Sequence, residues 1–219
     1  MEHTRIIRVT GKGQLKLRPD TTRITVSLTG VCPEYADALE HAAADAETVK
    51  DVLQPFGFLR EDLRTLHFSV DPEYEGYDDH GVYKNRFAGY RFRHGLKVEF
   101  PSDNARLGRI LYALAHSSVQ PELQIDYTVR DTEAAKNLLL EKAVADARAK
   151  AELLAKASGV KLLSVLSIHY ALESVDFIAR PMARSMLCKA ESADASYAFD
   201  VEPDDIEVND TVTVVWQIA

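Results

Sequence analysis

The stretch TEAAKNLLLEKAVADARAKAELLAKAS, residues 132–158, is followed by Gly159 and decides the fold. Apolar and small side chains recur in it at steps of three and four, which places them on one side of a 3.6-residue helix. These side chains are Leu140, Ala143, Ala147, Ala151 and Leu154. Asp131 is a good N-cap acceptor, and Gly159 can take the left-handed conformation that ends a helix. The sequence therefore predicts one long helix whose alanine face packs closely on a sheet or on a second helix.

The remaining surface of this helix is charged. Opposite charges stand four residues apart, which lets them pair along a solvated face. The pairs are Lys142 with Asp146, Asp146 with Lys150, and Arg148 with Glu152.

Outward from the helix, apolar and polar residues alternate with the period of two that is typical of strands. This pattern predicts strands at 22–31, 66–70, 90–100, 123–129, 163–172 and 208–218, and shorter helices at 34–53 and 102–116. A strand begins at 6–9, and we expect Gly11-Lys12-Gly13 to break it. Residues 71–86 are polar, and we expect a loop there.

Strands that follow one another with helices inserted between them favour an α+β fold. We predict an antiparallel or mixed sheet packed against the long alanine-rich helix and a second, shorter helix. A strand–helix–strand order recurs around 22–70 and 90–129, so we also consider a weak internal duplication. We expect a single domain, 1–219, with 1–130 and 131–219 as sub-modules and a flexible loop at about 174–205.

The composition is that of an ordinary globular chain, with 46% hydrophobic and 27% charged residues in 219. The net charge of −8 arises in residues 190–219, which hold eight acidic and no basic residues, whereas residues 1–189 carry 26 of each sign. No basic end precedes an apolar run at the start, and no window is long and apolar enough to span a membrane. We therefore expect a soluble, cytoplasmic protein without a membrane span, and without nucleic acid as its main partner. Cys32 and Cys188 are expected to be free thiols.

Two polar motifs were weighed as ligand sites. Gly11 and Gly13 lack the third glycine and the following helix of a phosphate loop, so we interpret them as a turn or bulge. The acidic run 71–80 does not have the spacing of a calcium loop, and we interpret it as a solvated loop. Its members are Asp71, Glu73, Glu75, Asp78, Asp79 and His80.

Basic and aromatic residues mix in the segment 84–97, a pattern found in RNA-binding strands. If Tyr90 and Phe92 share a face with Leu96, however, they belong to the core. Arg86, Arg91, Arg93 and Lys97 then form the outer face. RNA binding through this strand predicts an affinity that falls steeply with salt, and unchanged binding in an Arg91→Glu, Arg93→Glu variant would exclude it.

Motifs for catalysis are not found: the sequence contains no HExxH, GxSxG or CxxC. Met182, Met186 and Cys188 could hold a soft metal such as Cu(I), but we favour a mobile loop or an oligomer contact. We therefore assign no catalytic, cofactor-binding or metal-binding residue, expect no cofactor, and predict that the protein is not an enzyme.

Several stretches, taken in order, resemble the SIMPL-domain family, a group of largely unassigned function. They are VTGKGQLKLRPD (9–20), EDLRTLHFSVDPEY (61–74), AGYRFRHGLKVEF (88–100), KAVADARAKAELLAKASGVKLLSVLSI (142–168), RPMARSM (180–186) and VTVVWQI (212–218). The resemblance implies an α+β fold, assembly into homo-oligomers, and roles in stress tolerance, the cell envelope or, in animals, kinase adaptors. The family includes periplasmic immunogen-type members, and the resemblance implies no catalytic residue. The secretion signal of many bacterial members is absent at the start, and Pro203-Asp204 stands where the family has Pro-Gly.

The leading hypothesis is a non-enzymatic, self-assembling protein of unknown biochemical role, stress- or envelope-related. The alternative is a small-molecule or metal-binding module that uses a pocket between the sheet and the long helix, with His67, Tyr90 or His94 at its mouth. Binding of RNA is the third hypothesis. The protein partner, if it is not a second copy, is not indicated by the sequence.

Overall fold

The computed structural model describes residues 5–170, 175–179 and 203–219. They form an α+β fold, as predicted, in two compact units. Unit 1 is discontinuous and draws on residues up to 20, 128–179 and 204–219; unit 2 contains 21–127. The single domain with sub-modules 1–130 and 131–219 stays a prediction, as does the internal duplication. The predicted flexible loop at 174–205 lies mostly outside the described residues.

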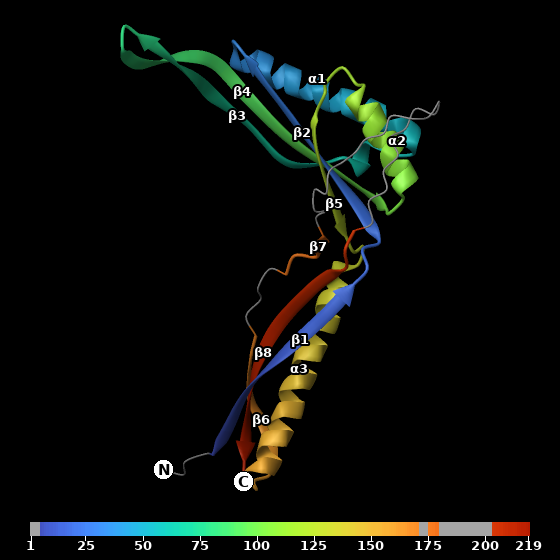
Figure 1. Ribbon diagram of the computed structural model, residues 1–219, viewed down its shortest axis with the longest axis vertical. Helices are drawn as coiled ribbons and strands as arrows, with labels where there is room; N and C mark the ends of the chain where they lie inside the picture. Colours follow the sequence, from blue (N-terminus) through green and yellow to red (C-terminus); the bar gives the residue numbers. More distant parts are fainter. Residues whose placement is uncertain (1–4, 171–174, 180–202) are drawn as a thin grey trace. The chain divides into compact units, whose positions relative to one another are not determined.

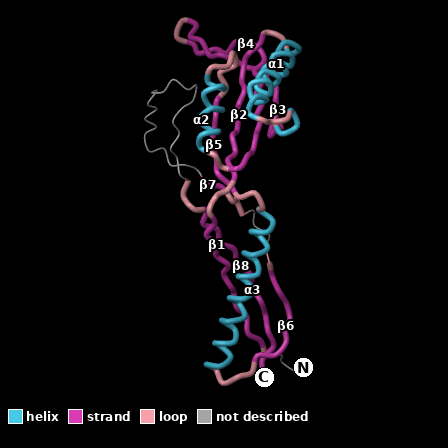
Figure 2. The backbone as a smooth tube through the Cα atoms, turned by 90° about the vertical axis from the view of Figure 1, so that its right-hand side faces the viewer, coloured by secondary structure: helices cyan, strands magenta, loops and turns pink. Residues whose placement is uncertain are grey.

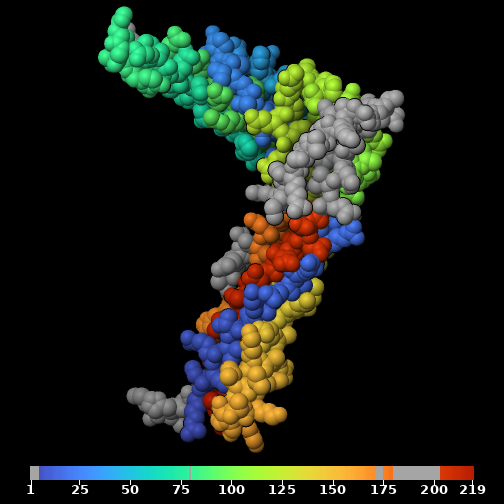
Figure 3. All heavy atoms as spheres, in the orientation of Figure 1, coloured from blue at the N-terminus to red at the C-terminus, as the bar shows by residue number. Residues whose placement is uncertain are grey.

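In unit 1 a three-stranded sheet packs against the long helix. The sheet has the order β1-β8-β6, formed by β1 (Ile6–Leu17), β8 (Ile206–Ile218) and β6 (Leu162–His169). Both pairings are antiparallel, and β1 runs beside β8 from Ile6 opposite Gln217 to Leu17 opposite Ile206. A two-residue strand, β7 (Ile178–Ala179), also belongs to this unit. Helix α3 (Thr132–Ala157) lies along β1 and β8 (Figures 1 and 3).

Both predicted signals at the ends of α3 are confirmed. The Asp131 carboxylate accepts from the Ala134 amide at 2.8 Å, and Gly159 has a φ of 69°. Its buried face differs slightly from the predicted one, because Leu139 and Ala155 are buried whereas Leu154 is 47% exposed. The face consists of Ala135, Leu139, Ala143, Ala147, Ala151 and Ala155. Its central alanines, Ala143, Ala147 and Ala151, pack with Val9, Val212, Val214 and Trp216.

The expected break at Gly11-Lys12-Gly13 is wrong, because β1 continues through it. A Cβ on Gly11 would overlap the backbone of Ala143 and Ala147, and one on Gly13 would overlap the Leu139 carbonyl. The glycines therefore allow the alanine face of α3 to reach the strand. At this point the Asp146 carboxylate accepts from the Lys12 amide at 2.7 Å.

In unit 2 the strands lie in the order β3-β4-β2-β5. They are β2 (Thr21–Cys32), β3 (Arg64–Asp79), β4 (Val82–Pro101) and β5 (Glu122–Thr128), and β4 is antiparallel to both β2 and β3. Helices α1 (Tyr35–Leu53) and α2 (Asn104–Ala115) share one core with this sheet, and short 3₁₀ turns lie at Gln54–Phe56 and Arg60–Asp62. Buried residues of β2 and β4 alternate with exposed ones, as the period of two predicted.

The loop expected at 71–86 is also wrong. Strands β3 and β4 run through it as one long hairpin, which extends beyond α1 (Figures 1 and 2). His80 and Gly81 form the turn, with φ values of 54° and 85°, and Asp78 accepts from the Gly81 amide at 2.7 Å. Two successive residues with positive φ suit the tight turns that match the twist of paired strands. Apart from the turn, the backbone of the expected loop is therefore paired between the two strands, from Asp71 opposite Arg91 to Asp79 opposite Val82.

Candidate interaction surface

The β3–β4 hairpin has one charged and one aromatic face, because successive side chains of a strand point to opposite sides. On the charged face, Asp71, Glu73 and Glu75 of β3 lie beside Arg86, Arg91 and Arg93 of β4. On the other face lie the rings of β3 and β4, close to the first residue of α1.

The charged face is neutralised within the hairpin. Glu73 accepts two hydrogen bonds from Arg91, both at 2.9 Å, and the Arg93 guanidinium lies 3.2 Å from the Asp71 carboxylate. The Glu75 carboxylate forms an ion pair with Arg86. The hydrogen bond from Arg91 lowers the pKa of Glu73, and the same bond raises the pKa of Arg91.

These pairs bear on the RNA hypothesis. Lys97 also has a carboxylate partner, since its Nζ lies 3.5 Å from Glu99. The four basic residues that were predicted to form the outer face of this strand are therefore matched by acids on neighbouring positions. Phosphates would have to compete with these carboxylates. The predicted absence of a nucleic-acid partner nevertheless stays a prediction.

The aromatic face is a chain of edge-to-face contacts. Ring centroids are 5.9 Å apart for Tyr74 and Phe87, 5.3 Å for Phe87 and Tyr90, and 5.5 Å for Tyr90 and Tyr35. Tyr74 is 60% exposed, and Phe87 and Tyr35 are about half exposed. Phe68, which lies nearer the start of β3, is also nearly half exposed. We define the aromatic face as Tyr35, Phe68, Tyr74, Phe87 and Tyr90.

The exposure of the aromatic face follows from the reach of α1. This helix packs on β2 and β4 but makes few contacts with β3. Phe92 and Leu96 of β4 are consequently buried, as the sequence predicted, whereas rings nearer the hairpin tip have no helix above them. The continued alternation of Asp71, Glu73 and Glu75 could have signalled a strand here, but nothing in the sequence gives the extent of the helix cover.

The three residues proposed for the mouth of a pocket do not converge. His94 lies on the α1 side of the sheet, 3.1 Å from the Thr65 hydroxyl and edge-on to Phe68. His67 lies on the opposite side, with its ring over Gly95. Burial lowers the pKa of His94, and the charges of His67 and Lys50 add to the shift. These histidines and Tyr90 belong to unit 2, whereas the long helix belongs to unit 1.

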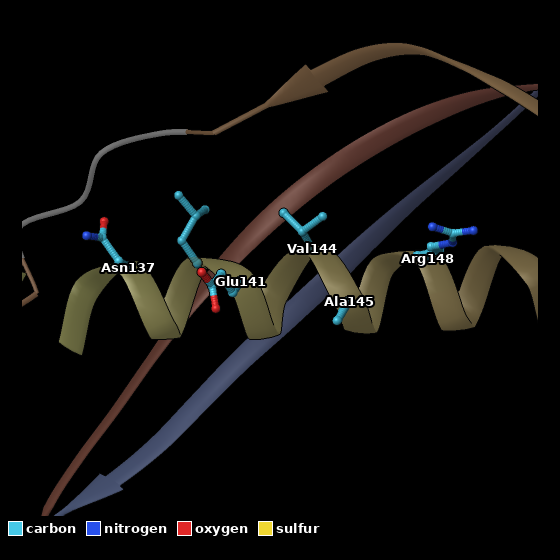
Figure 4. A pocket seen from close by; sticks show the side chains of 6 residues that line it. Asn137, Glu141, Val144, Ala145 and Arg148 are labelled. Carbon is cyan, nitrogen blue, oxygen red and sulfur yellow. The ribbon is translucent and has the colours of Figure 1, made fainter. Parts of the chain in front are cut away.

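A shallow groove does occur on α3. It is lined by Asn137, Leu140, Glu141, Val144, Ala145 and Arg148 (Figure 4). All six residues come from one helix, and Arg148 is held by Glu152 at 3.0 Å. The groove thus offers an apolar strip with charged residues along it, and its lining has no convergent set of polar groups.

Within the described ranges, no group of three or more His, Cys, Asp or Glu side chains is arranged to hold a metal ion. Cys32 is buried in the core of unit 2, whereas Met182, Met186 and Cys188 lie outside the described residues. No helix in the described part of the chain is long and apolar enough to cross a membrane.

Comparison with known proteins assigns the chain to a family. The model of the SIMPL family, described as a protein of unknown function (DUF541), matches residues 7–216. The chain belongs to the SIMPL family. It is also similar to the 26 kDa periplasmic immunogenic proteins of Brucella melitensis biotype 1 and Brucella abortus strain S19. Identity to each is 26% over 213 residues, which cover 97% of this chain and 84% of the relative.

The names of these relatives contradict the predicted cytoplasmic location, since both proteins are called periplasmic. The expectation rested on the absence of a secretion signal at the start of the sequence. Export signals are removed from mature proteins, so the composition of a folded SIMPL chain does not record its compartment.

Proposed function

We propose that this SIMPL chain is a non-enzymatic protein of the bacterial envelope that assembles with copies of itself. The observation that carries the proposal is the aromatic face of the β3–β4 hairpin. A periplasmic setting is supported by the names of the two Brucella proteins. The non-enzymatic part is supported by a family description without an activity and by relatives that are not named as enzymes.

The aromatic face favours a protein contact for a physical reason. Removing apolar surface from water is favourable, and contiguous exposed apolar patches on soluble proteins commonly mark interaction sites. Tyr and Phe are enriched in the cores of such interfaces, where their rigid rings fill pockets at small entropic cost. Tyr74, Tyr35 and Phe87 are 60%, 50% and 49% exposed. Their rings are already arranged, because Tyr74 contacts Phe87, and both Phe87 and Tyr35 contact Tyr90.

The charged face supports the same proposal, because it directs association to the other side of the hairpin. Its carboxylates and guanidinium groups are already paired with one another. A partner would gain little from replacing these pairs, since exposed ion pairs contribute little and are screened by salt. The aromatic face is therefore the side on which burial yields the larger gain.

Light scattering coupled to size exclusion tests the proposal. The full chain should elute as a discrete oligomer at micromolar concentration, and a Tyr74→Ser, Phe87→Ser variant should have a lower mass. A Leu59→Ser variant is the matched control, because Leu59 is a 63% exposed apolar residue of the same unit outside the aromatic face. A full chain that stays monomeric over the whole concentration range would refute self-assembly.

A further inference from the structure

Strand β6 lies at one edge of the three-stranded sheet of unit 1. The order β1-β8-β6 leaves it paired with β8 alone among the described residues (Figure 2). An edge strand presents a row of unpaired backbone N–H and C=O groups, which can pair with a strand of another chain. The two edges of this sheet can therefore be compared for what covers them.

The middle of the β1 edge, at Thr10 and Lys12, is covered by α3. Asp146 of the helix accepts from the Lys12 amide at 2.7 Å, and Lys150 reaches the Thr10 carbonyl at 3.5 Å. These contacts satisfy backbone groups that point away from β8. No comparable contact to the outer edge of β6 is found among the described residues, and α3 makes few contacts with this strand. Among the described residues, the sheet thus has one edge that is protected at its middle and one open edge.

The sequence of β6, LLSVLSIH, lacks the usual means by which open edges are protected. It contains no Asp, Glu, Lys, Arg, Pro or Gly. Four of its apolar side chains are about half exposed, with Ile168 at 56%. These side chains are Leu163, Val165, Leu166 and Ile168. An uncharged, apolar strand at an open edge is the kind of segment that pairs with another strand. Within the described part of the chain, the protective feature that β6 does have is a pair of irregularities in its register with β8.

The side of β6 that faces α3 carries exposed apolar side chains. Val165 pairs with Trp216 and Ile168 with Val214, and both partners are buried against the helix. Val165 and Ile168 therefore lie on the helix side of the sheet, but they are half exposed because α3 covers β1 and β8 instead. Val144 of α3, 37% exposed, points to the side on which β6 runs (Figure 4).

We propose that β6 pairs with β6 of a second copy of this chain, in antiparallel orientation, so that two three-stranded sheets become one sheet of six strands. This inference rests on the proposed self-assembly and names one of its contacts. Two identical antiparallel strands are related by a two-fold axis perpendicular to the sheet, which is the symmetry of a closed dimer. This axis places the helix-facing sides of the two sheets on the same face of the combined sheet. Val165 and Ile168 of both copies then line one continuous groove on that face.

Charge favours a second copy as the occupant at this particular edge. The net charge of −8 arises in residues 190–219, so repulsion between two copies acts mainly through that part of the chain. Strand β6 has no acidic or basic residue except His169, and two β6 strands can meet without placing like carboxylates opposite each other. Pairing in addition satisfies the backbone groups of both edges at once, because the contact is the same from either copy.

The test uses the full chain and two double variants, each adding two positive charges. Leu166→Lys, Ile168→Lys places lysines on the open edge, and Leu153→Lys, Leu154→Lys places them on the exposed surface of α3 as the matched control. By light scattering, the edge variant should fall to half the mass of the wild type, or to a smaller species, while the control keeps the wild-type mass. Circular dichroism checks that both variants are folded.

Cross-linking provides a second measurement. Single cysteines at 163, 165, 166 and 168 should give a disulfide-linked dimer at one or more positions under mild oxidation. Leu59→Cys and the wild type, which contains Cys32 and Cys188, should give none above background. Absence of a linked dimer at all four positions would overturn the pairing.

The outcomes separate the two proposals. An edge variant that keeps the wild-type mass, while Tyr74→Ser, Phe87→Ser lowers it, overturns β6 pairing and leaves self-assembly standing. A wild type that is monomeric throughout overturns both, and would direct attention to a strand of a different protein at this edge.

Discussion

Gly11 and Gly13 show at the scale of single residues how closely α3 approaches the sheet. Both occur inside a regular strand, where glycine ordinarily weakens the structure. Here the missing side chain leaves room for the backbone of α3 at Leu139, Ala143 and Ala147. The glycines of β1 and the alanines of α3 thus together allow the strand and the helix to pack closely.

We expect Gly11→Ala to lower the free energy of unfolding by about 1–3 kcal/mol, because the new methyl group must displace helix backbone that cannot move independently. Urea denaturation measures the change. Lys12→Ala is the control, since the Lys12 side chain is exposed and its backbone bond to Asp146 is retained. Equal stability of Gly11→Ala and the wild type would contradict the close packing.

His94 is a second residue with a measurable consequence. Burial lowers its pKa below the ordinary value of 6.5. Between that value and the lower pKa of the folded state, the unfolded chain binds a proton that the folded chain does not. Stability contributed by neutral His94 is therefore complete above pH 6.5 and declines as the pH falls through this window.

Urea midpoints at pH 7.5 and at pH 5.5 test this expectation. The wild type should be less stable at the lower pH, and a His94→Gln variant should show a smaller difference between the two. His116, an exposed histidine at the end of α2, provides the control as His116→Gln. A pH dependence that is the same in all three proteins would show that another group causes it.

At the scale of elements, the β3–β4 hairpin is stabilised by pairs that cross between its strands. Diagonal neighbours of opposite charge support a register, and like charges there oppose it. We expect Arg91→Glu to lower the free energy of unfolding, because it replaces the partner of Glu73 with a second carboxylate. The exchanged pair Glu73→Arg, Arg91→Glu should recover part of the loss, as judged by urea midpoints. Failure of the exchange to recover any stability would mean that the pair contributes no attraction.

The same hairpin shows why a charge run is ambiguous in a sequence. Asp71, Glu73 and Glu75 predict a solvated loop if they are considered alone, and a strand face if Arg91 and Arg93 are known to lie opposite. The partners are about twenty residues away along the chain, so local composition cannot reveal them. The aromatic face depends in turn on this pairing, which brings Tyr74 of β3 beside Phe87 of β4.

At the scale of the whole molecule, the net charge of −8 opposes association and the apolar surfaces favour it. Salt screens repulsion between exposed charges, with a Debye length of about 8 Å at 0.15 M. We therefore expect self-association to strengthen as salt is raised from roughly 0.05 M to 0.5 M. Sedimentation velocity at a fixed protein concentration measures this. Dissociation at high salt would instead indicate an interface held by ion pairs.

The sequence alone determined the elements of this protein. The alanine stripe, the Asp131 cap and Gly159 predicted α3 nearly to its ends. Alternation predicted the α+β class and most of the strands, but it missed the continuation of β1 through Gly13 and the hairpin within 71–86. Resemblance to the SIMPL family, carried by stretches spread over the chain, is also confirmed. These features could be predicted because burial on one side of an element imposes a period on neighbouring residues.

Only the tertiary structure decided which surfaces remain exposed. The aromatic face exists because α1 ends its cover before β3, and the open edge exists because β6, and not β1, lies away from the side chains of α3. Neither property belongs to a single element. Each depends on the order of strands in a sheet and on the position of a helix above it, and contacts between residues distant in sequence set both.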